Sequence, residues 1–179
     1  MQVHKIKILS LDPGTKHIGF ASFSGTNLTD SGVKTVRQGS EKIILEHISK
    51  IVSRMIEEKQ PDYLVLEKNN FSQITQNVRL TRSIASMKII AKTIGILTYE
   101  FDLRTIRKEI CNDGNANKLR TAEVLITYFP ELSIFLKCKE KHVFRYYMNM
   151  FDAVAVGLTF VKQHISSTLP IQRNNLRKL

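Results

Sequence analysis

The sequence predicts an α/β fold in which a central mixed five-stranded sheet is flanked by helices. Short apolar stretches typical of strands alternate with longer segments whose apolar residues recur at helical spacing. Their order is three strands, a helix, a strand, a helix, a strand and then helices, which is typical of a mixed sheet. With 179 residues and no internal repeat, the chain is expected to form one domain over residues 1–165, followed by a basic tail, 166–179.

The first part of the chain predicts three consecutive strands. Apolar residues over 5–11 end at Asp12-Pro13-Gly14, which is a turn signal. A second strand is expected over 18–23, before the turn residues Gly25-Thr26-Asn27, and a third over 32–36. Because the connections are short, we expect these strands to form a meander.

The middle of the chain alternates between helix and strand. Residues 41–59 carry apolar side chains at helical spacing and are followed by Pro61-Asp62. The wholly apolar run 63–66 predicts a buried strand. A second helix is expected over 81–94, and a fifth strand over 96–101.

The remaining elements are predicted to be helical. A short helix over 104–110 precedes a loop, and a longer one over 118–128 ends at a proline. Residues 131–145 alternate lysines with apolar residues and favour neither helix nor strand. The last helix is expected over 146–164.

Charge indicates the class of partner. The chain has 27 Lys and Arg against 16 Asp and Glu, a formal net charge of +11. The stretches 72–92 and 162–179 contain basic residues and no acid. Such a balance favours a nucleic acid as partner, because each phosphate that is neutralised releases counterions. A basic surface that serves only solubility is the alternative.

Other classes are disfavoured by composition. The longest apolar runs fall far below the roughly 18 residues that span a bilayer, and the N-terminal residues lack the apolar core of a secretory signal. Cys111 and Cys138 fit no metal-binding or redox spacing. We therefore expect a cytoplasmic or other intracellular nucleic-acid compartment, no membrane partner and no small-molecule cofactor.

Three acids stand out by their context. Asp12 and Glu67 each follow an apolar strand, and Asp152 is expected near the start of the last helix. Carboxylates in such places lose hydration and repel one another, and a divalent cation relieves both effects. Two Mg²⁺ ions about 3.5–4 Å apart, or Mn²⁺ in their place, would activate water and stabilise the departing oxygen in phosphodiester hydrolysis. Taken singly, each acid could instead be structural.

The same acids lie in motifs that resemble those of RuvC-type Holliday junction resolvases. Residues 8–20 resemble the family's opening strand and turn, 60–67 its second acidic motif and 152–158 its last, in the family's order. The likeness covers the chain to about residue 165. It implies an RNase H-like nuclease domain, a homodimer, and a Mg²⁺-dependent crossover junction endodeoxyribonuclease that nicks four-way DNA junctions in symmetric pairs. Asp12, Glu67 and Asp152 would then be the catalytic metal ligands.

One position departs from the family pattern. The family usually has an acid or histidine three residues before its last aspartate, where this chain has Asn149. The spacing of Asn149 and Asp152 puts both on one helical face, and an amide oxygen can bind a hard cation without adding charge. We expect Asn149 to be a weaker metal ligand. His142 is a further candidate, though a solvated histidine is the simpler interpretation.

Basic and aromatic residues form a second group of candidates. By resemblance, Lys118 and Arg107 match positions where the family uses lysines near the scissile phosphate, and Lys118, the closer match, is expected to assist catalysis. Phe71 could stack on bases of an opened junction, or belong to the core. Arg79 and Arg82, one helical turn apart, are expected to hold phosphates, with a solvated helix face as the alternative.

Two other functions stay open, and a third is disfavoured. A branched-DNA-binding protein with weak or lost catalysis is one, and Asn149 would be its first sign. A nuclease of the same fold that processes RNA is another, although the strand leading to Glu67 fits a resolvase better. The Asp12 turn also resembles the first phosphate loop of actin-like ATPases, but those enzymes need two domains.

Overall fold

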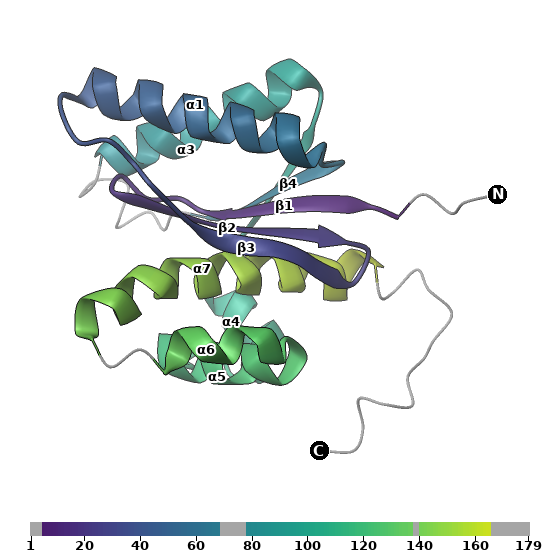
Figure 1. Cartoon of the computed structure of the whole chain (residues 1–179). Helices are drawn as coiled ribbons and strands as arrows, with labels where there is room; N and C mark the ends of the chain where they lie inside the picture. The colour runs from purple at the N-terminus through teal and green to yellow at the C-terminus, as the bar shows by residue number, and fades with distance from the viewer. Residues whose placement is uncertain (1–4, 69–77, 138–139, 166–179) are drawn as a thin grey trace.

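In the computed structural model, residues 5–68, 78–137 and 140–165 are described. They form three layers, with α1 and α3 on one face of a sheet and α4 to α7 on the other (Figure 1). Phe71 and the tail 166–179 lie outside the described residues, so the predictions made for them stay predictions. Among the described helices, none is long and apolar enough to cross a membrane.

The predicted mixed five-stranded sheet is confirmed. Its strand order is β3-β2-β1-β4-β5, where β1 pairs antiparallel with β2 and parallel with β4. The pair β2–β3 is antiparallel and β4–β5 parallel, as expected for a meander followed by helical crossovers. The strands are β1 Lys7–Asp12, β2 His17–Ser24, β3 Asn27–Thr35, β4 Tyr63–Glu67 and β5 Leu97–Phe101.

The prediction for β3 was wrong at its start, which lies five residues before Gly32. The segment Asn27–Ser31 contains one apolar residue, Leu28, and so has no alternation to reveal a strand, yet it pairs with β2 at the sheet edge. Gly25, with φ of +60°, and Thr26 make the tight connection between β2 and β3. Backbone pairing at an edge does not depend on apolar side chains, so this half of the strand had no sequence signal.

The helices begin at side-chain caps that the sequence contains. Ser40, Asp102 and Asn117 each accept a hydrogen bond from the backbone N–H three residues ahead. The helices are α1 Glu41–Lys59, α3 Val78–Ile94, α4 Leu103–Cys111, α5 Lys118–Tyr128, α6 Ser133–Leu136 and α7 Lys141–Phe160, with a 3-10 turn at Pro130–Leu132 and a π-helical end at Val161–Ile165.

The last helix differs most from its prediction. It begins at Lys141, five residues before the expected start, so Asp152 lies in its middle. The early turns carry exposed Lys141, His142 and Arg145, which obscure the apolar pattern. Asp152 therefore does not stabilise the N-terminus of α7, because the favourable effect of an acid on a helix N-terminus falls off within the first turn.

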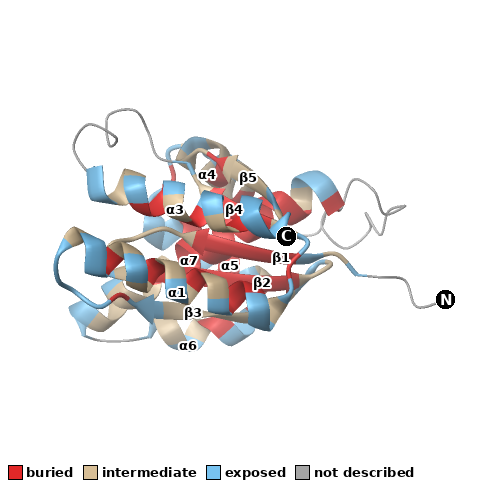
Figure 2. Ribbon diagram, turned by 90° about the horizontal axis from the view of Figure 1, so that it is seen from above, coloured by how far each residue is buried: buried red, intermediate tan, exposed pale blue. Residues whose placement is uncertain are grey.

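Side chains alternate across the sheet, so each strand serves two apolar clusters. Leu9 and Leu11 of β1 pack under α1 and α3, whereas Ile8 packs against α7. From Met150 to the end of α7 at Phe160 every residue is buried, because the sheet covers one side of the helix and α4 and α5 the other. Buried positions run along β1 and β2 at the centre of Figure 2. The helix that carries Asp152 is thus the central helix of the domain.

Candidate active site

Asp12 and Glu67 end two neighbouring parallel strands. Leu11 of β1 pairs with Leu66 of β4, so the two acids come one residue later at the same edge of the sheet. Ile8 and Val65 both face α7, and the two-residue period of a strand puts Asp12 and Glu67 on that same face. The sheet therefore presents both carboxylates to the helix that carries Asp152.

Close backbone contacts fix α7 above these strand ends. A Cβ atom added at Gly19, the β2 partner of Asp12, would lie 1.8 Å from the carbonyl oxygen of Asn149. The buried hydroxyl of Ser10 donates a hydrogen bond to the carbonyl oxygen of Ala153 at 2.8 Å. These contacts hold the turn of α7 around Asp152 against β1 and β2.

Burial raises the pKa of all three carboxylates, and neighbouring carboxylates raise that of Asp12 and Glu67 further. Burial raises the pKa of Asp12 well above its usual value, and the charges of Asp152 and Glu67 raise it further. Burial, followed by the charge of Asp152, raises the pKa of Glu67 to about 7. Burial also raises the pKa of Asp152, which is 8% exposed. The site thus holds negative charge that is costly to keep without a cation.

Two basic residues counter part of this repulsion. Lys118 is the first residue of α5, after its cap Asn117, and its ammonium forms an ion pair with Oδ2 of Asp152. Burial lowers the pKa of Lys118, but the charges of Asp152, Asp12 and Glu67 outweigh burial and raise it. The charge of Arg107 on α4 lowers the pKa of Glu67 and of Asp152. Both predicted cations are therefore beside the acids.

The donor set fits a hard divalent cation. It consists of carboxylate oxygens, which Mg²⁺ and Mn²⁺ prefer, and these are largely desolvated and repel each other. As the side chains stand, no three His, Cys, Asp or Glu side chains of the described residues form a group that could hold a metal. The Lys118 ammonium contacts Asp152 in this arrangement, so a cation would compete with Lys118 for that carboxylate.

Asn149 lies one helical turn before Asp152, as its spacing predicts. Its side-chain nitrogen donates to the carbonyl oxygen of Tyr146 at 3.0 Å, within the same helix. The amide oxygen is the atom of this side chain that could bind a cation. The role of Asn149 as a metal ligand stays a prediction.

The remaining candidates lie away from the carboxylates. Arg79 and Arg82 are on α3, which covers the opposite face of the sheet (Figure 1). Arg79 is exposed, whereas Arg82 is held by Glu41, with 2.6 Å between Nη1 and Oε1. His142 is exposed at the start of α7, where Nε2 is 3.1 Å from Oε2 of Glu140. This contact supports the simpler interpretation of His142.

Two positioning residues were not anticipated from the sequence. Ser10 is a polar residue inside an otherwise apolar strand, and Gly19 interrupts the interior of β2. Both are signals that could have been used: a buried hydroxyl needs a hydrogen-bond partner, and a strand glycine often marks a close backbone approach. Neither signal names the element that approaches.

Comparisons with known proteins agree with this geometry. The family model for the crossover junction endodeoxyribonuclease RuvC matches residues 8–160. A crossover junction endodeoxyribonuclease RuvC from Neorickettsia sennetsu is 29% identical over 167 residues, which cover 88% of this chain and 93% of the relative. The solved structure of Thermus thermophilus RuvC is similar in fold, with a TM-score of 0.69 at 17% identity over 89% of this chain and 98% of that one. The same enzyme in complex with a Holliday junction substrate gives a TM-score of 0.66 at 19% identity, covering 86% of this chain and 92% of that one.

Proposed function

The chain belongs to the RuvC family of crossover junction endodeoxyribonucleases, and we propose that it resolves four-way DNA junctions by hydrolysing phosphodiesters at Asp12, Glu67 and Asp152. The observation that carries this proposal is the meeting of these carboxylates from β1, β4 and α7, where the charge of Asp152 raises the pKa of both other acids and the charge of Glu67 raises that of Asp12. Such mutual repulsion favours a site that binds divalent cations over a site that serves stability alone.

We propose Mg²⁺ as the cofactor, with Mn²⁺ as a substitute, held by Asp12, Glu67 and Asp152 and assisted by the amide oxygen of Asn149. When bound, such cations would lower the pKa of water and counter the charge on the phosphate that reacts. The protein contributes the fixed positions of the acids, because Ser10 and Gly19 hold α7 against β1 and β2, and β1 ends at Asp12 beside Glu67 of the paired strand β4.

Lys118 and Arg107 are proposed to act on the DNA phosphates. Both lie close enough to the acids to change their pKa. Lys118 is 56% exposed along its side chain, so its ammonium can leave Asp152 and reach a phosphate. There it would offset the negative charge that develops in the transition state.

We propose that the protein acts on branched DNA as a homodimer in an intracellular nucleic-acid compartment. A homodimer of this chain carries the site twice, and twofold symmetry then relates the two cleavage positions. Paired nicks at symmetric positions would resolve a four-way junction into two duplexes. The net charge of +11 favours such a polyanionic substrate.

The experiment is incubation of a synthetic four-way DNA junction with the protein and Mg²⁺ or Mn²⁺. Wild type is expected to nick two strands at symmetric positions, and Asp12→Asn and Glu67→Gln are expected to bind the junction without cutting it. Binding without cleavage by wild type under both metals would show a junction-binding protein instead. Cleavage of structured RNA with the junction left intact would show an RNA-processing nuclease.

A further inference from the structure

A hollow of about 440 Å³ opens beside the carboxylates, between the start of α5 and the first half of α7. Its polar lining includes Lys118, which contacts Asp152, and Asn149, one turn before that acid. Arg145 lies on the same stretch of α7. The hollow is therefore continuous with the candidate active site and distinct from the carboxylates themselves.

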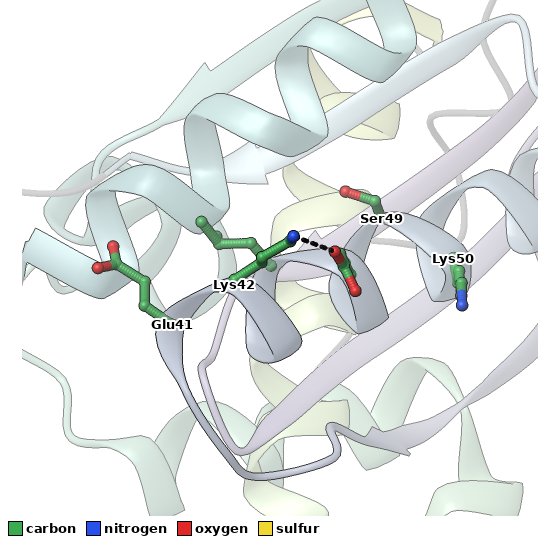
Figure 3. Close-up of a pocket in the computed structure, with 6 residues that line it drawn as sticks. Glu41, Lys42, Ser49 and Lys50 are labelled. Atoms are coloured by element: carbon green, nitrogen blue, oxygen red, sulfur yellow. Dashed lines mark ion pairs between the residues drawn. The ribbon is translucent and has the colours of Figure 1, made fainter.

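Charge separates this hollow from three others on the described surface. It is lined by Lys118 and Arg145 and by no acid. The hollow along α1 contains Glu41 and Glu46, and there Lys42 is paired with Glu46 at 4.0 Å (Figure 3). The other two hollows include Glu100 and Glu109, respectively. A DNA phosphate would be repelled by a glutamate in each of those three hollows. In the hollow between α5 and α7, the charged side chains of the lining are both cations.

The cation Arg145 is available for a ligand. Within the described part of the chain, the Arg145 guanidinium forms no ion pair or hydrogen bond with another side chain, and the residue is exposed. By contrast, Arg54 and Arg82 are each within 2.7 Å of a glutamate oxygen. A guanidinium can bind a phosphate through two parallel hydrogen bonds.

The rest of the lining is apolar. Three apolar side chains line the hollow beside Lys118 and Asn149. Leu119 is 48% exposed, Phe144 is partly buried, and Met148 is buried. Nucleobases present apolar faces that stack on aromatic and aliphatic side chains. The hollow thus combines the two kinds of contact that one nucleotide offers, a charged phosphate and a flat apolar base.

We propose that this hollow is a nucleotide subsite, which takes the nucleotide next to the scissile phosphate of the cleaved DNA strand. Arg145 binds the backbone phosphate of that nucleotide, and Phe144 and Leu119 contact its base. The inference rests on the proposed function and adds a part of the substrate that the carboxylates do not touch. Arg145 acts in binding, so its loss affects substrate affinity and leaves the chemical step nearly unchanged.

The first test compares Arg145→Ala with Lys50→Ala, which removes an equal charge from the exposed surface of α1 on the other face of the sheet. Binding of a four-way junction in Ca²⁺ is measured over a range of salt concentrations. Arg145→Ala is expected to weaken binding about tenfold and to lower the slope against log salt by about 0.9, with Lys50→Ala close to wild type. In single-turnover cleavage with Mg²⁺, Arg145→Ala should need a higher protein concentration to reach half of its maximal rate. The maximal rate itself should change less than about twofold.

The second test addresses the base. Junctions that carry one abasic nucleotide, placed in turn on either side of the cleavage position, are bound by wild type and by Phe144→Ala. Wild type should lose about five- to tenfold in affinity at one of these positions, whereas Phe144→Ala should bind the intact and abasic junctions equally. Because both substrates are compared on the same protein, a loss of stability in the variant does not change the ratio.

The subsite proposal is contradicted if Arg145→Ala binds the junction with the same affinity and salt dependence as Lys50→Ala. It is also contradicted if Phe144→Ala loses as much affinity at the abasic position as wild type does. In that case wild-type cleavage of the same junction would still support the proposed function. If wild type does not cleave the junction but Arg145→Ala still weakens junction binding as expected, the proposed function is contradicted and the nucleotide subsite is supported.

Discussion

The two faces of the sheet carry helices of different character. On the face of α1 and α3, charged side chains pair with one another at the surface, as Arg82 does with Glu41 and Lys88 with Glu100. On the face of α7, three carboxylates gather in a largely buried place, and Lys118 forms an ion pair with one of them, Asp152. These charges of the first face are paired with opposite charges, whereas the second face keeps a repulsion that a bound cation would relieve.

The largest expected effect comes from removing one carboxylate of the α7 face. Asp12→Asn should lower the rate of junction cleavage by about 10³-fold, and it should also stabilise the metal-free protein by about 1 kcal/mol, because a repelled charge is lost. Glu41→Gln, which removes an acid from the opposite face, should change neither quantity by much. Equal loss of cleavage in both variants would contradict the difference between the faces. Cleavage assays and thermal unfolding measure the two quantities.

The next largest effect concerns the docking of α7. Gly19→Ala puts a methyl group against the carbonyl oxygen of Asn149 and should destabilise the protein by about 2–3 kcal/mol, since backbone has to move. Gly25→Ala, at a turn with open space around it but φ of +60°, should cost only about 1 kcal/mol. Denaturant unfolding of both variants gives the comparison. Similar losses would show that α7 does not press on β2 at Gly19.

The pH dependence of stability should reveal the repulsion directly. The pKa of Glu67 is about 7 in the folded protein against an ordinary 4.5, so the folded state binds more protons between these values. Metal-free stability should therefore fall as pH rises through this window, by about 1–2 kcal/mol once solvent screening is allowed for. Glu67→Gln should flatten the slope, and added Mg²⁺ or Mn²⁺ should reverse it, because ionised carboxylates bind the cation. If Glu67→Gln loses stability with rising pH as steeply as wild type, the pH dependence comes from other titratable groups.

Lys118→Met should strengthen Mn²⁺ binding in the absence of DNA by about fivefold, because a competing cation leaves Asp152. The same variant should cleave junctions more slowly, because no ammonium reaches the phosphate. Lys118→Arg is the matched control, since it keeps the charge. Calorimetric titration with Mn²⁺ measures the affinity, and weaker binding by Lys118→Met would mean that Lys118 supports the metal site instead of competing with it.

The smallest effect is expected on the α3 surface. Arg82→Ala should change stability by less than about 0.5 kcal/mol, because its pair with Glu41 is exposed. If these arginines bind DNA, Arg82→Ala and Arg79→Ala should each weaken junction binding relative to wild type, because both residues are exposed. Fluorescence anisotropy with labelled junction DNA separates the two arginines. Binding as tight as that of wild type in both variants would leave α3 as a solvated face.

Much of the architecture could be predicted from the sequence because its signals are local. The helical spacing over α1 and the apolar run of β4 depend on neighbours along the chain, and both were confirmed. The first half of β3 and the first turns of α7 were missed, since an exposed edge strand and an exposed helix end need few apolar residues. Their formation depends on partners elsewhere in the chain.

The sequence by itself determined the three acids, their order, the basic excess and the mixed sheet. The tertiary structure decided that Asp152 lies in the middle of a buried helix, that Gly19 and Ser10 hold this helix over Asp12, and that Lys118 contacts Asp152. It also decided which arginines are paired and which hollow lacks acids. The reason is physical: secondary structure follows short-range patterns, whereas pKa shifts, ion pairs and close backbone contacts depend on distances between segments far apart in the sequence.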